Sequence, residues 1–265
     1  MGVVVEMECM NNFLAKSFNT VFTGDWHVGA RGVDKVALKK MVEYIKQSGA
    51  NWMFTGDMCE STAHTHKNFD MRTQDPEIRG IEEEYAYCRK LIKPIAGQCA
   101  GILTGNHDER NAKHSEVDMV KLICEDLEIP YLKNAAYTRI KYKAYGKTCS
   151  TLVYMVHGFS SGRQRGSRIN SLESLSNAHR ADLYVSGHTH DMFVTSALID
   201  TMSEAGNYMQ KMLYFGNTGT FLRSYVQGQT SYAESAGYRP NKVGYLEAVF
   251  NPADRSLNMQ EVVLR

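Results

Sequence analysis

The sequence lacks the cysteine patterns of disulfide-stapled or zinc-binding small proteins. No two cysteines are spaced as Cys-x-x-Cys, and the six that occur are Cys9, Cys59, Cys88, Cys99, Cys124 and Cys149. A chain of 265 residues can bury a large core without covalent staples. We therefore expect reduced thiols in a cytoplasmic protein.

Long apolar runs and an excess of charge are also missing. No stretch approaches the roughly 18 apolar residues of a membrane-crossing helix. The N-terminus has no basic segment followed by an apolar one, as a secretory leader would. The formal net charge is +1, which excludes a bulk attraction to nucleic acid or to an anionic membrane. Any contact with a polyanion must then be local, and we expect no membrane association.

The chain has no linker-like stretch that could divide it into domains. Proline occurs only five times, and no stretch rich in Pro, Gly or Ser separates the two halves. No internal repeat is visible. With 43% apolar and 22% charged residues, the composition is that of a globular protein. We expect a single domain over residues 1–265.

Short apolar runs that end in glycine or histidine recur along the chain. They predict buried strands, since they are rich in β-branched and aromatic residues, and they lie at 20–23, 52–55, 102–104, 152–156, 183–186 and 212–215. Apolar residues at helical spacing occupy the segments between them, at 38–45, 78–91, 120–127 and 169–175. Alternating strands and helices indicate an α/β fold.

The pattern changes from about residue 131 onward. Expected strands then follow one another with few helices between them, at 137–145, 151–155, 192–198, 212–215 and 245–250. This change predicts a second, partly antiparallel sheet formed by the later half of the chain. We expect two packed mixed β-sheets flanked by helices.

Metal-binding side chains follow five of the predicted strands. They are Asp25, His27, Asp57, Asn106, His157, His188 and His190. Any one of these motifs alone is more often an ordinary turn, but strand ends converge at one edge of a sheet, where open α/β folds bind ligands. Seven nitrogen and oxygen ligands are too many for one ion, so two ions sharing a carboxylate are expected.

In these blocks the sequence resembles the calcineurin-like metallophosphoesterases. The five blocks of that superfamily match in order at 24–27, 56–57, 105–108, 157–158 and 187–190. Residues 105–110, 157–170 and 237–240 resemble, more narrowly, a phage and bacterial branch of uncertain substrate. The resemblance implies a four-layer α/β/β/α sandwich.

The resemblance also implies the two ligand sets. The first metal would be held by Asp25, His27, Asp57 and His190. The second would be held by Asp57, Asn106, His157 and His188, with Asp57 bridging. No thiolate occurs in any block, so the site favours Mn, Fe or Zn. Of these we expect manganese.

The expected mechanism follows from two cations roughly 3.5–4 Å apart, which lower the pKa of a bridging water and neutralise phosphoryl oxygens. Hydroxide then attacks the phosphorus. His107 resembles the family's general acid, which protonates the leaving oxygen. Glu60 resembles the acid that orients this histidine, and we expect it to hydrogen-bond His107. The alternatives are a structural turn histidine and an ordinary loop carboxylate.

A loop with three arginines, at 160–168, directly follows His157. Guanidinium groups match phosphate oxygens in pairs, so we expect Arg163 foremost, and Arg165, to bind substrate. A solvated run of charge before a helix explains the loop equally well.

Several tyrosines gather near the C-terminus. They are Tyr225, Tyr232, Tyr238 and Tyr245. One possibility is that their rings stack on nucleic-acid bases. We prefer the alternative, that they fill the edge of a core or an oligomer interface.

The expected function is hydrolysis of a phosphodiester, with a nucleotide or short nucleic acid preferred. Asp108, the last residue of its block, resembles diesterases more than phosphatases, which usually carry glutamate there. Ser61 departs from the Gly-Asp-x-x-Asp-Arg-Gly pattern of phosphoprotein phosphatases. The alternatives are a phosphomonoesterase of the same fold and a non-catalytic scaffold. A DNA-bound nuclease would need a long basic groove that the sequence does not show.

Overall fold

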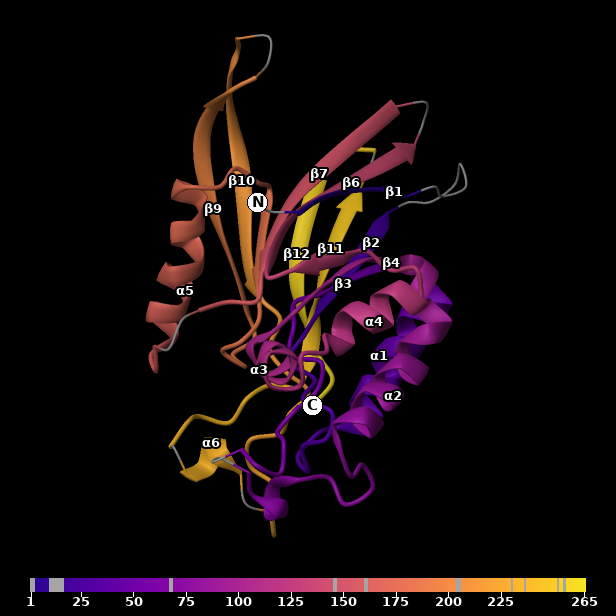
Figure 1. The fold of residues 1–265 in the computed structure, drawn as a ribbon. Helices are drawn as coiled ribbons and strands as arrows, with labels where there is room; N and C mark the ends of the chain where they lie inside the picture. The colour runs from indigo at the N-terminus through magenta and orange to yellow at the C-terminus, as the bar shows by residue number, and fades with distance from the viewer. Residues whose placement is uncertain are drawn as a thin grey trace.

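The structure is a computed structural model of the chain. It describes residues 3–9, 17–66, 69–144, 147–159, 162–203, 206–229, 231–235, 237–251, 253–254 and 256–265. Its strands form two six-stranded sheets that pack face to face, with helices on both outer sides (Figure 1). Among these residues, no helix combines the length and the apolar character needed to span a membrane.

The first sheet contains the strands that precede three of the predicted ligand blocks. Its order is β12-β11-β2-β3-β4-β5, with β2 Phe18–Thr23, β3 Asn51–Phe54, β4 Cys99–Leu103, β5 Tyr131–Lys133, β11 Gly244–Asn251 and β12 Ser256–Val263. The strands β2 to β5 run parallel, whereas β11 is antiparallel to both β2 and β12.

The second sheet contains the strands that precede the other two blocks. Its order is β1-β6-β7-β8-β10-β9, with β1 Val3–Cys9, β6 Ala135–Ala144, β7 Lys147–Val156, β8 Leu183–Ser186, β9 Phe193–Met202 and β10 Tyr208–Asn217. The strands β7, β8 and β10 run parallel, and hairpins add β6 and β9 antiparallel to them.

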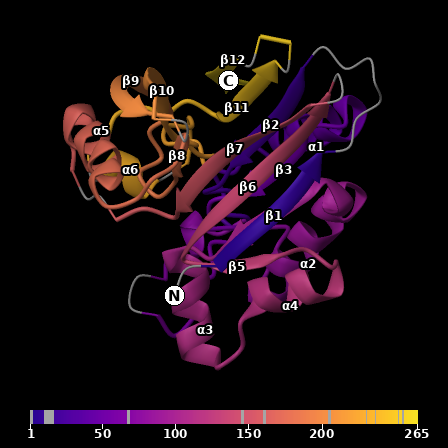
Figure 2. The ribbon, with the colours of Figure 1, turned by 90° about the horizontal axis from the view of Figure 1, so that it is seen from above.

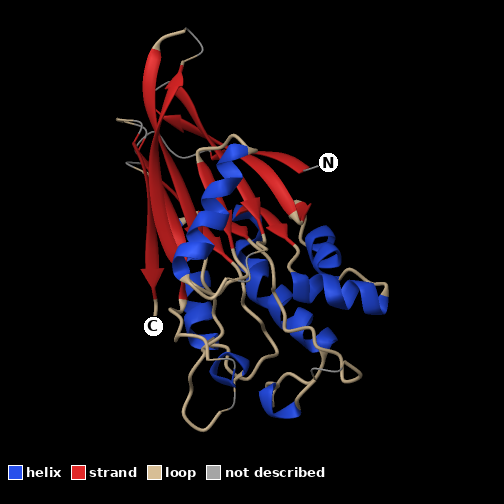
Figure 3. Cartoon of the chain, turned by 90° about the vertical axis from the view of Figure 1, so that its left-hand side faces the viewer, coloured by secondary structure: helices blue, strands red, loops and turns tan. Residues whose placement is uncertain are grey.

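The helices cover the outer faces of both sheets. The first sheet is covered by α1 Lys35–Ser48, α2 Ile81–Ile92 and α4 Met119–Asp126, and the second by α5 Arg165–Glu173. Figure 2 shows these two groups on opposite sides. Two further helices, α3 Asn106–Ser115 and the short α6 Tyr232–Ser235, lie toward the end of the molecule where loops gather (Figures 1 and 3).

The predicted helix before Gly49 forms for identifiable local reasons. The side chain of Asp34 accepts a hydrogen bond from Ala37 N–H at 2.9 Å, which caps the start of α1. Gly49 ends the helix in the left-handed conformation, with φ 70°. Leu38 and Ile45 lie on its buried face, so the predicted periodicity is confirmed.

Three apolar cores separate the four layers. The middle core lies between the sheets and includes Phe22, Met53, Val153 and Leu246. A second core joins the first sheet to α1, α2 and α4, and a third joins the other sheet to α5. The predicted α/β fold of two packed mixed sheets flanked by helices is confirmed.

The predicted division of the chain between the sheets is wrong in part. The strand predicted at 245–250 does not join the later sheet, because β11 pairs with β2 through Leu246 and Phe22. The N-terminal β1 instead pairs with β6 in the second sheet. Strand propensity identifies a strand but not its partner, and β2 would otherwise be left as an open edge.

Leu246 tests the middle core. It is fully buried, so Leu246→Ala should lower the free energy of unfolding by about 2–5 kcal/mol through lost burial and a cavity. Urea denaturation measures this change. The control Val36→Ala alters a residue that is 65% exposed on α1 and should shift stability by less than about 0.5 kcal/mol. Equal losses in the two variants would contradict the assigned core.

Candidate metal centre

The seven predicted ligands follow the carboxyl ends of strands from both sheets. In chain order, after β2, β3, β4, β7 and β8, they are Asp25, His27, Asp57, Asn106, His157, His188 and His190. Strands that run parallel end at the same edge, so packing the two sheets brings these side chains together. The structure therefore joins all five blocks in one site.

Five of these seven residues have a left-handed backbone conformation. The φ angles lie between 48° and 69° at Asp25, His27, Asp57, His188 and His190. This conformation costs a non-glycine residue about 1–3 kcal/mol, and it persists only where the surrounding structure imposes it. The sequence gives only a faint signal for it, because Asp and His tolerate this region better than most residues.

Backbone hydrogen bonds hold the turn after β2 against the turn after β3. Asp25 N–H donates to Gly56 C=O at 2.9 Å, and Trp26 N–H donates to Asp57 C=O at 2.9 Å. The hydroxyl of Thr220 donates to Asp25 C=O at 2.6 Å from the other side. These bonds fix the strained turns and therefore the directions of their side chains.

One cluster of ligand atoms joins Asp25, His27 and His190. These atoms all lie within 4.8 Å of one another. The Nε2 atoms of the two histidines are 2.9 Å apart, and Asp25 Oδ1 lies 3.4 Å from His190 Nε2. Three of the four side chains predicted to hold the first metal thus lie around one point.

A second cluster joins Asp57, His157 and His188, again within 4.8 Å. Asn106 belongs to it through its side-chain oxygen, which lies 3.0 Å from His157 Nε2 and 2.8 Å from His188 Nδ1. These are the four residues predicted for the second metal.

Asp57 lies between the two clusters. Its Oδ2 atom is 3.3 Å from His157 Nε2 and 3.8 Å from His27 Nε2. Its Oδ1 atom accepts a hydrogen bond from His107 N–H at 2.8 Å. One carboxylate oxygen therefore faces nitrogens of both clusters, which is the position that a bridging ligand requires.

Contacts on the far side of two rings fix which nitrogen can bind metal. His27 Nδ1 lies 3.1 Å from the carboxylate of Glu60, and His157 Nδ1 lies 2.8 Å from the carbonyl oxygen of Thr55. Both partners only accept, so each Nδ1 carries hydrogen and each neutral ring presents a lone pair at Nε2. These lone pairs face the Asp57 carboxylate, and this donor set fits a cation.

The carboxylates and imidazoles stabilise one another's charged forms. Burial raises the pKa of Asp25, but hydrogen bonds to His190 and His27 outweigh burial and hold the pKa below its ordinary value. Burial lowers the pKa of His157, but the charge of Asp57 outweighs it and raises that pKa to about 9. A cation would displace these protons, so metal binding should release them.

The structure corrects the predicted partner of Glu60. The Glu60 carboxylate bonds to His27 at 3.1 Å and accepts from the Thr62 hydroxyl at 3.2 Å. Its nearer approach to His107 Nδ1 is 3.7 Å, beyond hydrogen-bond distance. The backbone carbonyl of Glu60 accepts from His107 Nδ1 instead, at 2.8 Å. The carboxylate is turned away because His27 and Thr62 hold its two oxygens.

Arg110 is a neighbour of His107 that the sequence argument did not assign. It lies one helical turn later on α3, with Nη2 2.9 Å from His107 Nδ1. The same Nη2 donates to Glu60 C=O and to the Thr62 hydroxyl, each at 3.1 Å. Burial lowers the pKa of His107, and the charges of His27 and Arg110 add to this effect.

Asp108 supports the turns of two blocks from within. Its Oδ2 accepts from Gly105 N–H at 3.1 Å and from Met58 N–H at 3.3 Å, while its Oδ1 accepts from the Tyr85 hydroxyl at 2.9 Å. Burial and the charge of Asp57 raise its pKa to about 6. Asp108 therefore links the turns of two ligand blocks to α2.

Glu84, on α2, supports the segment after Glu60 and lies outside all five blocks. Its side chain is buried, and Oε2 accepts from Ser61 N–H at 2.8 Å. Burial raises its pKa to about 8. The apolar periodicity around it, which includes Tyr85 and Cys88, gave no reason to single out a carboxylate.

Of the predicted substrate arginines, Arg163 lies on the loop before α5 and Arg165 is the first residue of α5. Arg165 donates to Met192 C=O at 3.0 Å, two residues after His190, and lies 3.8 Å from Glu261. Arg163 is exposed, with its guanidinium carbon 5.7 Å from the ring centre of Tyr238. Residues 160 and 161 of this loop lie outside the described residues. Within the described residues, neither arginine forms a hydrogen bond or ion pair with a predicted ligand, so their role stays a prediction.

The C-terminal tyrosines do not form one group. Tyr245 is buried and stacks on Tyr44, with ring centres 6.0 Å apart. Tyr225 is 42% exposed and donates to Tyr238 C=O at 2.6 Å. The side chain of Tyr232 lies outside the described part. At least one of the four therefore fills the core.

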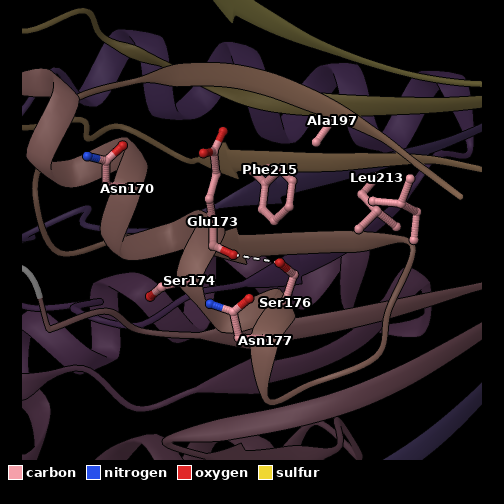
Figure 4. Close-up of a pocket in the computed structure, with 9 residues that line it drawn as sticks. Asn170, Glu173, Ser174, Ser176, Asn177, Ala197, Leu213 and Phe215 are labelled. Carbon is pink, nitrogen blue, oxygen red and sulfur yellow. Dashed lines mark hydrogen bonds between the residues drawn. The ribbon is translucent and has the colours of Figure 1, made fainter.

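A cavity of about 410 Å³ lies away from both clusters, between α5 and the β9–β10 hairpin. Figure 4 shows Phe215 and Leu213 on its sheet side and Asn170 and Glu173 on its helix side. None of the seven predicted ligands lines it. The cavity and the candidate metal centre are therefore separate features.

Comparison with known proteins agrees with the family resemblance seen in the sequence. A family model described as calcineurin-like phosphoesterase matches residues 18–192, which include all seven predicted ligands. A search of curated proteins found no match.

Solved structures show similarity at low sequence identity. GAP50 of Plasmodium, described as the anchor in the inner membrane complex, is similar with a TM-score of 0.51 and 10% identity, over 94% of this chain and 85% of that chain. A Thermotoga maritima protein, TM1076, is 13% identical over 93% of this chain and 99% of its own, with a TM-score of 0.37. The first of these likenesses supports the fold alone.

Glu84→Gln tests whether a buried, protonated carboxyl supports the site. Between its unfolded value of 4.5 and its folded pKa of about 8, folded Glu84 keeps a proton that the unfolded chain releases, so stability falls as pH rises through this window. Glutamine has no such proton and can still accept from Ser61. The melting temperature of the variant relative to wild type should therefore rise from pH 5 to pH 8 and then level off, measured in chelator.

The matched control is Glu82→Gln, which changes an exposed glutamate on the same helix. Its melting temperature should follow the wild type at every pH. Parallel curves for Glu84→Gln and wild type would contradict the raised pKa.

Proposed function

The chain belongs to the calcineurin-like phosphoesterase family, and from this premise we propose that it hydrolyses phosphodiesters with two divalent cations, manganese foremost. The observation that carries the proposal is the place of Asp57. One of its oxygens faces ring nitrogens from both clusters, at 3.3 Å and 3.8 Å. Two adjoining clusters that share a carboxylate are what a dinuclear centre needs.

The seven predicted ligands would hold the two cations. Asp25, His27 and His190 would hold one cation, with Asp57 shared. The other would be held by Asn106, His157 and His188. When bound, two cations lower the pKa of a water molecule and neutralise phosphoryl oxygens.

His107 is proposed as the general acid. Its Nδ1 faces the Glu60 carbonyl at 2.8 Å, which leaves Nε2 as the atom that gives a proton to the leaving oxygen. The main-chain carbonyl can accept only from a protonated Nδ1. Arg110 Nη2, 2.9 Å from the same Nδ1, can only donate, so Nδ1 is engaged in either tautomer and Nε2 is the nitrogen left to face the leaving oxygen. In this arrangement the carboxylate of Glu60 acts as a positioning group for His27.

A diester of nucleotide type is the proposed substrate class. Asp108 closes its block as it does in diesterase-like sequences, and Arg163 is exposed on the loop that follows His157 in the sequence. An exposed guanidinium on this loop can meet a phosphate oxygen. Hydrolysis of a monoester is the nearest alternative, and a panel of both ester types with Mn, Zn and Mg separates them.

A non-catalytic scaffold is the second candidate, and one observation favours it. The similar GAP50 is described as an anchor. In this chain, however, all seven predicted ligand positions carry metal-binding side chains that the fold brings together. We therefore favour the enzyme, and measured hydrolysis decides between the two.

Metal content tests the shared carboxylate. Protein purified without chelator should bind up to two transition-metal ions per chain, and activity should be lost in chelator and restored by Mn. Asp57→Asn should lose both ions, whereas Asp25→Asn should lose one. Elemental analysis gives the stoichiometry. A fully active metal-free protein would refute the proposal, and equal metal loss in both variants would refute the bridge.

Leaving-group dependence tests His107. His107→Ala should keep its metals but lose roughly 10²–10⁴-fold in kcat/KM on an ester with a ribose or alkyl leaving group. The loss should be much smaller on p-nitrophenyl esters, because that leaving group departs without a proton. The control His114→Ala changes an exposed histidine on the same helix and should retain both activities. Equal losses on both esters would remove His107 from the acid role.

A further inference from the structure

The second sheet ends at an open edge formed by β9. This strand pairs with β10 over ten residues, Phe193–Met202 against Tyr208–Asn217. On its other side it has no partner strand within the described residues. Figure 1 shows the β9–β10 hairpin extending beyond the end of α5. An edge of this length offers a row of backbone donors and acceptors to another strand.

The hairpin fixes which backbone groups point outward. Ser203 N–H donates to Asn207 C=O at 2.8 Å, next to the turn. Antiparallel pairs alternate between bonded and non-bonded residues, so the odd-numbered residues of β9 bond to β10. The free N–H and C=O groups belong to the even-numbered residues, from Val194 to Met202.

One face of the hairpin carries four exposed apolar side chains. Leu198 lies opposite Met212, and Met202 lies opposite Tyr208, so these four side chains share a face. Their exposed fractions are 57%, 41%, 71% and 68%, respectively. Asp200 and Gln210 lie between the two apolar pairs on this face. Exposed apolar side chains on a protruding edge favour an interaction surface.

The edge lacks most of the features that keep such strands apart. β9 contains no lysine and no proline, and its register with β10 is continuous, without a bulge. Its one charged residue is Asp200, which accepts from the Tyr208 hydroxyl at 2.8 Å and from Gln210 at 3.2 Å.

We propose that β9 pairs antiparallel with β9 of a second copy of this chain, about a twofold axis at Leu198. In this register, Leu198 meets its own copy and Ser196 lies opposite Asp200 of the second copy. Thr195 then meets Thr201. Val194 meets Met202 and Ala197 meets Ile199 in the same way. Apolar groups thus meet apolar groups, and the one charge meets a hydroxyl donor.

Neighbouring registers do not match in this way. An axis at Asp200 places two aspartates opposite each other. An axis at Ile199 places Leu198 opposite Asp200, and an axis at Ala197 places Val194 opposite Asp200. Of these registers, the axis at Leu198 pairs residues 194–202 without setting Asp200 against an apolar residue or another aspartate, which is why the edge fits a second copy. It also brings two copies of the four exposed apolar side chains to one side of the joined sheet.

Ser196 gives a test that is specific for this register. Ser196→Asp would set a carboxylate against Asp200 of the other copy twice per dimer, whereas Ser196→Lys would set an ammonium there. Wild type and Ser196→Lys should sediment as dimers at tens of micromolar. The dimer of Ser196→Asp should dissociate at a concentration at least about tenfold higher than that of Ser196→Lys. The double change Ser196→Asp with Asp200→Lys should restore the dimer.

The control is Val263→Lys, which adds a lysine to an edge strand of the other sheet at a residue that is 50% exposed; it should remain dimeric. Melting curves check that every variant is folded. A monomeric wild type would overturn the proposal and leave the edge to another protein or to none. Equal dissociation constants for the Asp and Lys variants would overturn it too, and would place any dimer elsewhere, as at the C-terminal tyrosines.

Discussion

The site depends on one buried carboxylate, Asp57, that faces imidazole nitrogens on two sides. Burial alone would neutralise such a group, and His157 in particular holds its pKa below the ordinary value. Because Glu60 and Thr55 hold the Nδ1 atoms of His27 and His157, the two Nε2 atoms cannot turn away. The arrangement needs positive charge at its centre, supplied by protons or by cations.

Close packing between the turns explains why glycine stands beside the ligands. A Cβ at Gly105 would lie 2.0 Å from Asp57 Oδ1, and one at Gly187 would lie 2.4 Å from Asp25 Oδ2. Neither glycine is needed for an unusual φ angle, because neither has one. Each leaves room for the carboxylate of a different block. The glycines thus couple the blocks sterically, and a turn that shifts disturbs its neighbour.

The sequence pattern predicted the residues of the site more accurately than it predicted which strands pair with one another. Each ligand follows a strand, so the ends of parallel strands were enough to predict that the seven side chains meet. Pattern could not assign β11 to β2, because the choice of partner depends on which edge is left open. It also missed Glu84 and Arg110. Their roles come from contacts with Ser61 and His107 across separate elements, and no local spacing encodes such contacts.

Glu60 lies near His107 as predicted, but the predicted hydrogen bond between its carboxylate and His107 is wrong. The family resemblance predicted the Glu60 carboxylate beside His107. The residue does lie there, but the group nearest to His107 Nδ1 is its carbonyl. A main-chain acceptor positions the ring without adding a negative charge beside it. The carboxylate is then free to fix His27, so one residue orients a predicted ligand and the predicted acid through different atoms.

The two interaction features lie at opposite ends of the sheets. The ligands follow the strand ends where loops gather, whereas the β9–β10 hairpin extends from the other end (Figure 3). β9 begins at Phe193, three residues after His190, and then runs away from the metal centre. The apolar residues near its tip are therefore separated from the ligands by most of the strand. The pairing proposed above is centred on Leu198, in the middle of the strand.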